Sequence, residues 1–219
     1  MNNKVLVIAV HPDDETIGCG GTLLKHKSSN DEINWLICTS ISEEHEDYHL
    51  RQNQIDKVSK LYKFDSVHDL KLKASQVDEY PFGQLIDKIS DVINIVKPNI
   101  IYLPFKHDVH SDHRKIFEAS FSCTKSFRYP FIKKILCIET VSETDFAPSF
   151  KDESFVPNVF IDITDFIEEK IEILRVYEKE LERHPFPRSE KNVLALATTR
   201  GAVSACEYAE SFILLKEIN

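Results

Sequence analysis

Glycine is scarce in this sequence. Only five of the 219 residues are glycine, where an average usage of ~7% would give about 15. Gly18, Gly20 and Gly21 cluster near the N-terminus, and Gly201 follows an arginine near the C-terminus. We therefore expect glycine only where the backbone tolerates no side chain. The N-terminal cluster predicts a sharp turn that packs tightly against a strand before the next helix begins.

The sequence also lacks a long apolar run and an excess of positive charge. No stretch approaches the ~18 apolar residues of a membrane-spanning helix, and the first ten residues resemble a buried strand more than a cleavable signal. The 36 acidic and 27 basic residues give a net charge of −9. This balance argues against a nucleic-acid partner but allows a small anionic ligand held by a few arginines.

No cysteine pair has the close spacing of a metal knuckle or a redox motif. The five cysteines, at positions 19, 38, 123, 137 and 206, are odd in number and widely spaced. We therefore expect reduced thiols and a cytoplasmic protein. Internal repeats, low-complexity segments and linkers are missing as well, which favours a single domain over residues 1–219.

Short apolar runs alternate with helical patterns along the chain. This alternation is typical of an α/β domain with a mainly parallel sheet flanked by helices. We predict strands at 4–10, 33–39, 67–72, 100–103, 135–139 and 159–163, and a short final strand at 212–215. Helices are predicted at 22–27, 51–62, 83–96, 113–123 and 165–181, the last with Thr164 as its N-cap, and one more begins at Ser189.

A first polar cluster follows the first predicted strand directly. His11 is followed by Pro12 and three acidic residues, Asp13 to Glu15. Ligands in open α/β sheets bind at the carboxyl ends of strands, so His11 and Asp14 are candidate metal ligands, with Asp13 left free beside the metal. The alternative is a charged helix N-terminus, in which the acids only cap the helix. The glycine spacing does not fit a dinucleotide-binding fingerprint.

A second polar cluster follows the strand predicted at 100–103. Three histidines and two aspartates fall within residues 107–113, again at the carboxyl end of a strand. One of these histidines would complete a His/Asp/His zinc site with an open position for water. Another could act as an acid or stabilise developing charge, and Asp108 or Asp112 could orient a ring. The alternative is a solvated polar loop.

The segments AVHPDDETIGCGGTL and DVHSDHRKIFEA together resemble the PIG-L/LmbE-type zinc-dependent deacetylases. The segments HPFPRSEKNVLALATTRG and EYAESF resemble C-terminal parts of the same family, so the resemblance extends over most of the chain. It implies a Rossmann-like α/β enzyme that removes N-acetyl groups from amino sugars and their conjugates.

The resemblance also implies roles for individual residues. The implied zinc ligands are His11, Asp14 and His113, a set that also suits Fe²⁺. Asp13 matches the general base of the family. His110 matches the histidine that stabilises the oxyanion or protonates the leaving amine, and Asp112 matches the aspartate that tunes that histidine.

Four further residues match substrate-binding positions of the family: Arg51, His184, Arg188 and Arg200. Arg51 stands in an RxxE pattern whose glutamate is here Gln54. From the residues alone, Arg188 and Arg200 could instead form structural salt bridges, and His184 could instead lie in a surface turn. Asp108 stands where some relatives carry an active-site tyrosine. Another histidine pair, His45 and His49, indicates a solvated loop more than a helical metal site.

The sequence thus predicts a zinc-dependent N-deacetylase of an amino sugar, including nucleotide-linked sugars of surface-glycan biosynthesis. The same chemistry on a GlcNAc-type thiol-precursor conjugate is one alternative. A non-catalytic α/β module that binds a sugar or nucleotide is another, although such a module needs no base beside an open metal site. Because relatives are often oligomeric, a homo-oligomer is also expected.

Overall fold

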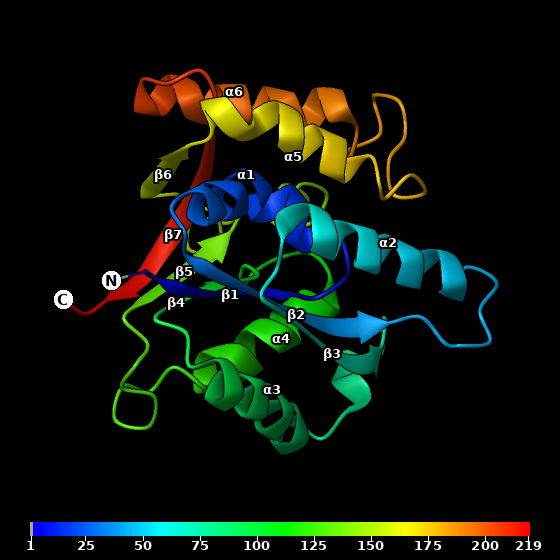
Figure 1. Ribbon diagram of the computed structural model, residues 1–219, viewed down its shortest axis with the longest axis vertical. Helices are drawn as coiled ribbons and strands as arrows, with labels where there is room; N and C mark the ends of the chain where they lie inside the picture. Colours follow the sequence, from blue (N-terminus) through cyan, green and yellow to red (C-terminus); the bar gives the residue numbers. More distant parts are fainter. Residues whose placement is uncertain (1) are drawn as a thin grey trace.

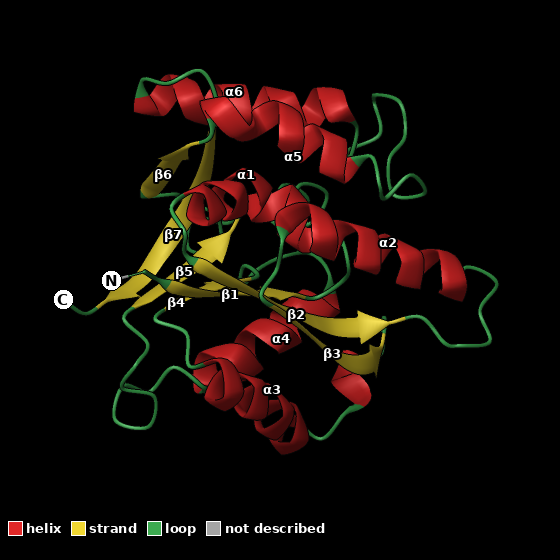
Figure 2. Cartoon of the chain, viewed as in Figure 1, coloured by secondary structure: helices red, strands yellow, loops and turns green. Residues whose placement is uncertain are grey.

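The computed structural model describes residues 2–219 and confirms the α/β class. Within these residues, seven strands form one sheet that is flanked by helices (Figure 2). In chain order the elements are β1 (Lys4–Ala9), α1 (Asp14–Ser28), β2 (Glu32–Ser40), α2 (Tyr48–Tyr62), β3 (Ser66–Lys73), a 3₁₀ turn (Val77–Glu79), α3 (Phe82–Val96), β4 (Ile100–Leu103), α4 (Ser111–Ser122), β5 (Lys134–Ile138), β6 (Val159–Asp162), a 3₁₀ turn (Thr164–Phe166), α5 (Ile167–Leu174), α6 (Glu190–Ser204) and β7 (Ala209–Glu217).

The strands lie in the order β3-β2-β1-β4-β5-β7-β6. The first five in this order are parallel, whereas β7 runs antiparallel to both β5 and β6. The chain moves outward from β1 through β2 and β3, and then returns to add β4 on the other side of β1. Such a reversal opens a crevice at the carboxyl ends of the two strands, which is where open α/β sheets bind ligands.

Apolar side chains fill the space on both sides of the sheet. Leu6 and Ile8 of β1 join the core beneath α3 and α4, whereas Val5 and Val7 join the core beneath α1 and α2. Figure 1 shows these two helix pairs on opposite faces, with α5 and α6 stacked beyond α1. Burial on both faces explains why β1 is almost continuously apolar in the sequence.

Helix α1 begins at Asp14 and not at the predicted Thr22. The clustered glycines therefore lie inside α1, and the predicted sharp turn before the helix is wrong. The glycines do pack tightly, but against β5 and the end of β6 and not against the first strand: a Cβ atom on Gly18 would come within 2.7 Å of Ile138 and one on Gly21 within 2.8 Å of Ile163. No side chain larger than hydrogen fits there without movement of the neighbouring strand or loop.

Helix α1 is kinked at Cys19, whose backbone angles (φ −149°, ψ 21°) are not helical. Buried side chains bond to the backbone on both sides of the kink. Lys170 donates to the carbonyl of Ile17 (2.9 Å), and Glu210 accepts from the N–H groups of Gly21 (2.9 Å) and Thr22 (2.7 Å). Lys170 and Glu210 also pair with each other at 2.7 Å. The C-terminal part of the chain thus holds the helix that follows the first polar cluster.

The C-terminal third differs from the prediction in two ways. Strand β7 spans Ala209–Glu217 and is much longer than the predicted strand at 212–215. The predicted helix at 165–181 is also too long, because α5 covers only Ile167–Leu174 and Thr164 makes no capping bond. After Leu174 the chain continues in i→i+3 turns, which direct the Tyr177 hydroxyl inward to Glu15.

Two remaining expectations concern histidines and membranes. Helix α2 begins at Tyr48, so His49 lies on the helix and His45 lies before it. Neither histidine belongs to a group within residues 2–219 that could hold a metal ion.

None of the helices in residues 2–219 is both long enough and apolar enough to cross a membrane.

Candidate active site

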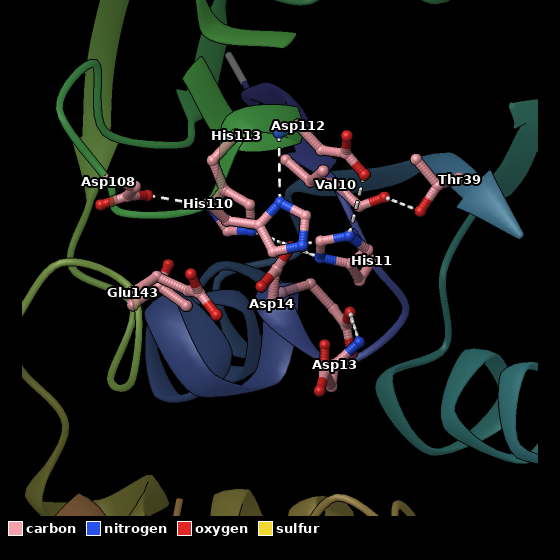
Figure 3. Close-up of polar contacts among 12 residues, drawn as sticks. Val10, His11, Asp13, Asp14, Thr39, Asp108, His110, Asp112, His113 and Glu143 are labelled. Carbon is pink, nitrogen blue, oxygen red and sulfur yellow. Dashed lines mark hydrogen bonds and ion pairs between the residues drawn. The ribbon is translucent and has the colours of Figure 1, made fainter. Parts of the chain in front are cut away.

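The two predicted polar clusters meet at the carboxyl ends of β1 and β4. The loop after β1 leaves the sheet at Val10, whose carbonyl accepts bonds from the Thr39 N–H (2.9 Å) and hydroxyl (2.8 Å). The loop after β4 leads to α4. Figure 3 shows His11 and Asp14 from the first loop facing His110 and His113 from the second. The strand reversal thus brings together residues about a hundred positions apart in the sequence.

Three of these side chains form a compact set of metal-ligand atoms. The His113 Nε2 atom lies 3.4 Å from both Asp14 Oδ2 and His11 Nδ1, and the last two atoms are 3.8 Å apart. A tetrahedral zinc ion with bonds of 2.0–2.1 Å needs ligand atoms about 3.4 Å apart. The residues present therefore fit a zinc ion with three protein ligands and one open position.

A second metal-compatible group contains His11, His110 and Asp112. It shares His11 with the first group. Its Asp112 carboxylate already accepts from the backbone N–H groups of Ser75 (2.7 Å) and Val77 (3.2 Å). Because these bonds occupy the carboxylate, the first group is the better match to a single ion.

Each histidine of the first group has a carboxylate at its other ring nitrogen. His113 donates from Nδ1 to the buried Asp108 at 2.9 Å, and Asp108 also accepts from the Thr144 hydroxyl at 2.7 Å. His11 Nε2 lies 3.4 Å from Asp112 Oδ2. Such carboxylates fix the orientation of a metal-binding ring and raise its basicity. The sequence left the choice between Asp108 and Asp112 open, and the structure uses both.

These contacts change the pKa values of the groups involved. Burial opposes charge on His113, but the Asp14 and Asp108 carboxylates outweigh it and raise the pKa of His113 to about 9. Burial also acts against ionisation of Asp112, yet hydrogen bonds from His11 and the backbone keep its pKa below the ordinary value. Neighbouring carboxylates thus favour positive charge on His113, and neighbouring donors favour an ionised Asp112.

His110 lies at the N-cap of α4, where its Nδ1 accepts the Asp112 backbone N–H at 3.1 Å. The neutral ring therefore carries its proton on Nε2. Burial, together with the nearby His11, lowers the pKa of His110 and favours the neutral ring. The Asp112 carboxylate contacts His11, and the hydrogen bond between Asp112 and His110 is made by the Asp112 backbone N–H. The tuning of His110 by Asp112 stays a prediction.

Asp13 is buried beside the ligand set and has a rare backbone conformation, with φ of 148°. Its Oδ2 accepts from Arg188 Nη1 at 3.1 Å. Burial and the neighbouring Asp14 carboxylate raise the pKa of Asp13 well above its ordinary value, against the opposing charge of Arg188. A carboxylate with a raised pKa is suited to accept and return a proton near neutral pH.

The structure brings two of the four predicted substrate-binding residues to this site. Arg51 and Arg188 line a pocket of about 260 Å³ together with His11, Asp13 and His110. Arg51 donates to the Pro12 carbonyl at 3.1 Å and pairs with Glu180. Arg188 bonds to the same Glu180 at 3.3 Å. One carboxylate thus holds both guanidinium groups at the pocket.

The structure does not bring His184 and Arg200 to this pocket. His184 lines a separate surface depression with Arg183 and Lys191. The Arg200 guanidinium pairs with Glu139, which also accepts from the Ser211 hydroxyl at 2.6 Å. Arg200 therefore makes the salt bridge that the sequence left open, and its position argues against the predicted contact with substrate.

Sequence reasoning gave no role to two further acidic residues. Glu143 lines the pocket, and burial raises its pKa. It follows β5, so the rule that ligands bind beyond carboxyl ends of parallel strands could have identified it. Glu15 is fully buried next to Asp14, and burial raises its pKa to about 7 against hydrogen bonds from Thr16 and Tyr177. Glu15 stands in the first cluster, but no residue pattern distinguished its role.

Comparison with known proteins connects this geometry to an activity. The model of one protein family, described as PIG-L: GlcNAc-PI de-N-acetylase, matches residues 6–124, which is more than half of the chain. The chain is also 27% identical over 224 aligned residues to the diacetylchitobiose deacetylase of Thermococcus kodakarensis. That match covers 94% of this chain and 81% of the relative.

Solved structures share the fold over nearly the whole chain. The N,N'-diacetylchitobiose deacetylase of Pyrococcus horikoshii, complexed with an inhibitor, superposes with a TM-score of 0.78 at 20% identity and covers 98% of this chain and 84% of its own. The zinc-inhibited form of teicoplanin deacetylase superposes with a TM-score of 0.73 at 13% identity, covering 96% and 97%. At these identities the structural likeness establishes the fold.

Proposed function

The chain belongs to the PIG-L family, which makes it an N-deacetylase and so a hydrolase of carbon–nitrogen bonds, and we propose that it uses zinc to deacetylate an N-acetylated amino sugar. The observation that carries this proposal is the set formed by His11, Asp14 and His113, with Asp13 beside it. Because three ligands leave one position open, this set is typical of catalytic zinc sites.

Zinc held by these residues would supply a water of lowered pKa and polarise the acetamide carbonyl. Asp13 accepts the proton of the attacking water as the oxygen bonds to the carbonyl carbon. His110 donates from Nε2 to the developing oxyanion, because its Nδ1 is occupied by the Asp112 N–H. Asp13 then returns the proton to the leaving nitrogen as the C–N bond breaks, which gives acetate and a free amine.

The two arginines of the pocket support this mechanism in different ways. Arg188 holds the Asp13 carboxylate and so favours its ionised form. It also lines the pocket with Asp13 and His110, where its positive charge can contact an oxygen of the substrate. Arg51 fixes the Pro12 carbonyl and therefore the loop that carries both His11 and Asp13.

An N-acetylated amino sugar is the substrate class that these findings favour. The relative from Thermococcus kodakarensis is a diacetylchitobiose deacetylase. The pocket of about 260 Å³ lies just below the ~300–1,000 Å³ of common small-molecule sites. It therefore suits one sugar ring, with any aglycone, nucleotide or thiol-precursor group lying beyond the rim.

Acetate release from a panel of N-acetylated amino sugars tests the proposal. We expect turnover of at least one member and about one zinc ion per chain in the purified protein. Asp13→Asn should keep the zinc and lose at least about 100-fold in kcat, as expected for removal of a general base. His113→Ala should lose the zinc. Full turnover by Asp13→Asn would disprove the base assignment, and a metal-free active protein would disprove the zinc assignment.

A further inference from the structure

Glu15 lies beneath the active site but does not line its pocket. Its side chain is completely buried, and all of its neighbours in hydrogen-bonding distance are donors. Oε1 accepts from the hydroxyls of Thr16 (2.6 Å) and Tyr177 (2.9 Å), and Oε2 accepts from the backbone N–H of Asp13 (3.1 Å). These three donors hold the buried carboxylate in one orientation.

The bond to Asp13 is notable because the Asp13 backbone is strained. Its φ of 148° and ψ of −27° lie outside the regions that residues other than glycine normally occupy. Such a conformation persists only where the surroundings hold it, and it often occurs at functional sites. The Asp13 carbonyl is held by the N–H groups of Thr16 (3.0 Å) and Ile17 (2.9 Å), and Glu15 holds the N–H on the other side.

The network that fixes Glu15 extends into the rest of the protein. The buried Tyr62 of α2 donates to the Thr16 hydroxyl at 3.2 Å. Tyr177 follows α5, and the Arg51 guanidinium lies 5.9 Å from the centre of its ring. Two segments far apart in the sequence therefore orient one carboxylate, which in turn contacts the peptide of Asp13.

We propose that Glu15 is a positioning residue for the deacetylation reaction. It holds the Asp13 peptide in the strained conformation from which the Asp13 side chain reaches the pocket and Arg188. Figure 3 shows Asp13 on the loop that also carries His11 and Asp14, and Asp13 lines the same pocket as His11 and His110. This inference rests on the proposed function of Asp13 as the general base.

Glu15→Gln is the sharpest test because it preserves size and packing. If the amide oxygen accepts from Thr16 and Tyr177, the NH₂ group faces the Asp13 N–H and cannot accept from it. The flipped amide would leave the buried Thr16 and Tyr177 hydroxyl protons without this acceptor. We expect kcat to fall about 10- to 100-fold, because a small misplacement of a reacting group has effects of this size. KM and zinc content should change much less than kcat, since Glu15 itself contacts neither the zinc ligands nor the substrate pocket.

Tyr177→Phe is the matched control. It removes one donor to the same carboxylate but leaves the bond to the Asp13 N–H in place. A role limited to folding predicts that both variants lower the unfolding midpoint and that kcat changes alike in both. A positioning role predicts a much larger loss of kcat in Glu15→Gln at a comparable loss of stability.

A double-mutant cycle with Asp13→Asn separates the two roles further. If Glu15 acts through Asp13, adding Glu15→Gln to Asp13→Asn should leave the residual rate unchanged. A crystal structure of Glu15→Gln should also show Asp13 moved out of the positive-φ region. Wild-type kcat in Glu15→Gln, or an equal fall in the Asp13→Asn background, would overturn this inference alone. A wild-type rate in Asp13→Asn would overturn both it and the proposed base.

Discussion

Asp108 and Asp112 contact the two histidines of the candidate metal-ligand set. Asp108 contacts His113, and Asp112 lies next to His11. Asp108 is itself fixed by the Thr144 hydroxyl and by the Phe105 N–H (3.3 Å). The ligand atoms are therefore held near tetrahedral spacing by a second layer of polar side chains and backbone groups.

Asp108→Asn should lower the zinc affinity about 10- to 100-fold, because the loss of such an outer carboxylate typically has this effect. The amide keeps an acceptor for His113 but loses the charge that makes the ring a stronger ligand. Competition with a coloured chelator at fixed pH measures the change. Asp91→Asn, on the exposed surface of α3, serves as the control and should match the unaltered protein. Equal affinities in all three proteins would contradict this account.

The contrast between Arg188 and Arg200 shows how far the sequence can predict a site at the level of single residues. His11, Asp13 and Asp14 are predictable because they are adjacent in sequence and lie at the end of a strand. Both arginines stand in family-like segments, yet Arg188 reaches Asp13 whereas Arg200 pairs with Glu139. Long side chains find their partners through tertiary packing, which a local pattern does not encode.

Helix α6 packs against the chain that follows it through Gly201. A Cβ atom there would lie 2.5 Å from the carbonyl oxygen of Glu207 and 2.7 Å from that of Cys206. Both contacts are with backbone atoms, which cannot move aside as a flexible side chain can. Gly83, near the start of α3, has no atom within 4 Å of such a Cβ.

These two glycines give a matched pair of Gly→Ala substitutions. We expect Gly201→Ala to lower the free energy of unfolding by about 1–3 kcal/mol, because overpacking against a rigid neighbour has that cost. Gly83→Ala should leave it unchanged or raise it by up to about 1 kcal/mol, because alanine is the better helix former. Urea unfolding of the two variants and the unaltered protein measures these changes in the free energy of unfolding. A stable Gly201→Ala variant would show that α6 can shift.

The last turn of α1 is attached to the sheet by His26. Its Nδ1 donates to Asp31 at 2.7 Å, and its Nε2 accepts from the Tyr102 hydroxyl at 2.9 Å. This arrangement suits the neutral ring, whose Nε2 accepts from the Tyr102 hydroxyl. Burial agrees with this arrangement and lowers the pKa of His26 below 6.5, despite the opposing Asp31.

The lowered pKa predicts a loss of stability in acid. Below about pH 6.5, His26 takes up a proton in the unfolded chain before it does so in the folded protein, so the free energy of unfolding decreases as the pH falls. His26→Gln cannot titrate and should show a weaker decrease between pH 7.5 and 5.5, although it starts from a lower stability at pH 7.5. Denaturation at several pH values in excess chelator measures both slopes. Equal slopes would exclude a contribution from His26.

At the scale of the whole molecule, the sequence predicts the first half of the fold better than the second. Strands β1, β2 and β4 are buried on both faces, so each appears as an apolar run of the right length. Strand β7 has only four buried residues, followed by five that are partly or fully exposed, and its place between β5 and β6 depends on contacts distant in sequence. Neither its length nor its antiparallel direction is visible in a local pattern.

The ion pair of Lys170 and Glu210 connects this C-terminal third to the kink of α1. Both side chains are buried, and both also bond to α1 backbone groups on either side of Cys19. Because helix α1 carries Asp14 and Glu15 at its start, the ends of the chain are joined at the base of the site. We therefore expect the N-terminal and C-terminal parts to unfold together.

Glu210→Ala should lower the free energy of unfolding by about 3–5 kcal/mol, because it leaves the Lys170 charge buried without a partner. In excess chelator, fluorescence of the single Trp35 on β2 and helical circular dichroism should both shift to the same lower midpoint, since one cooperative unit is disrupted. Glu190→Ala removes the exposed partner of Arg175 and should change stability by no more than about 1 kcal/mol. Separate midpoints for the two signals in Glu210→Ala would instead mean that the C-terminal third unfolds independently of the sheet around β2.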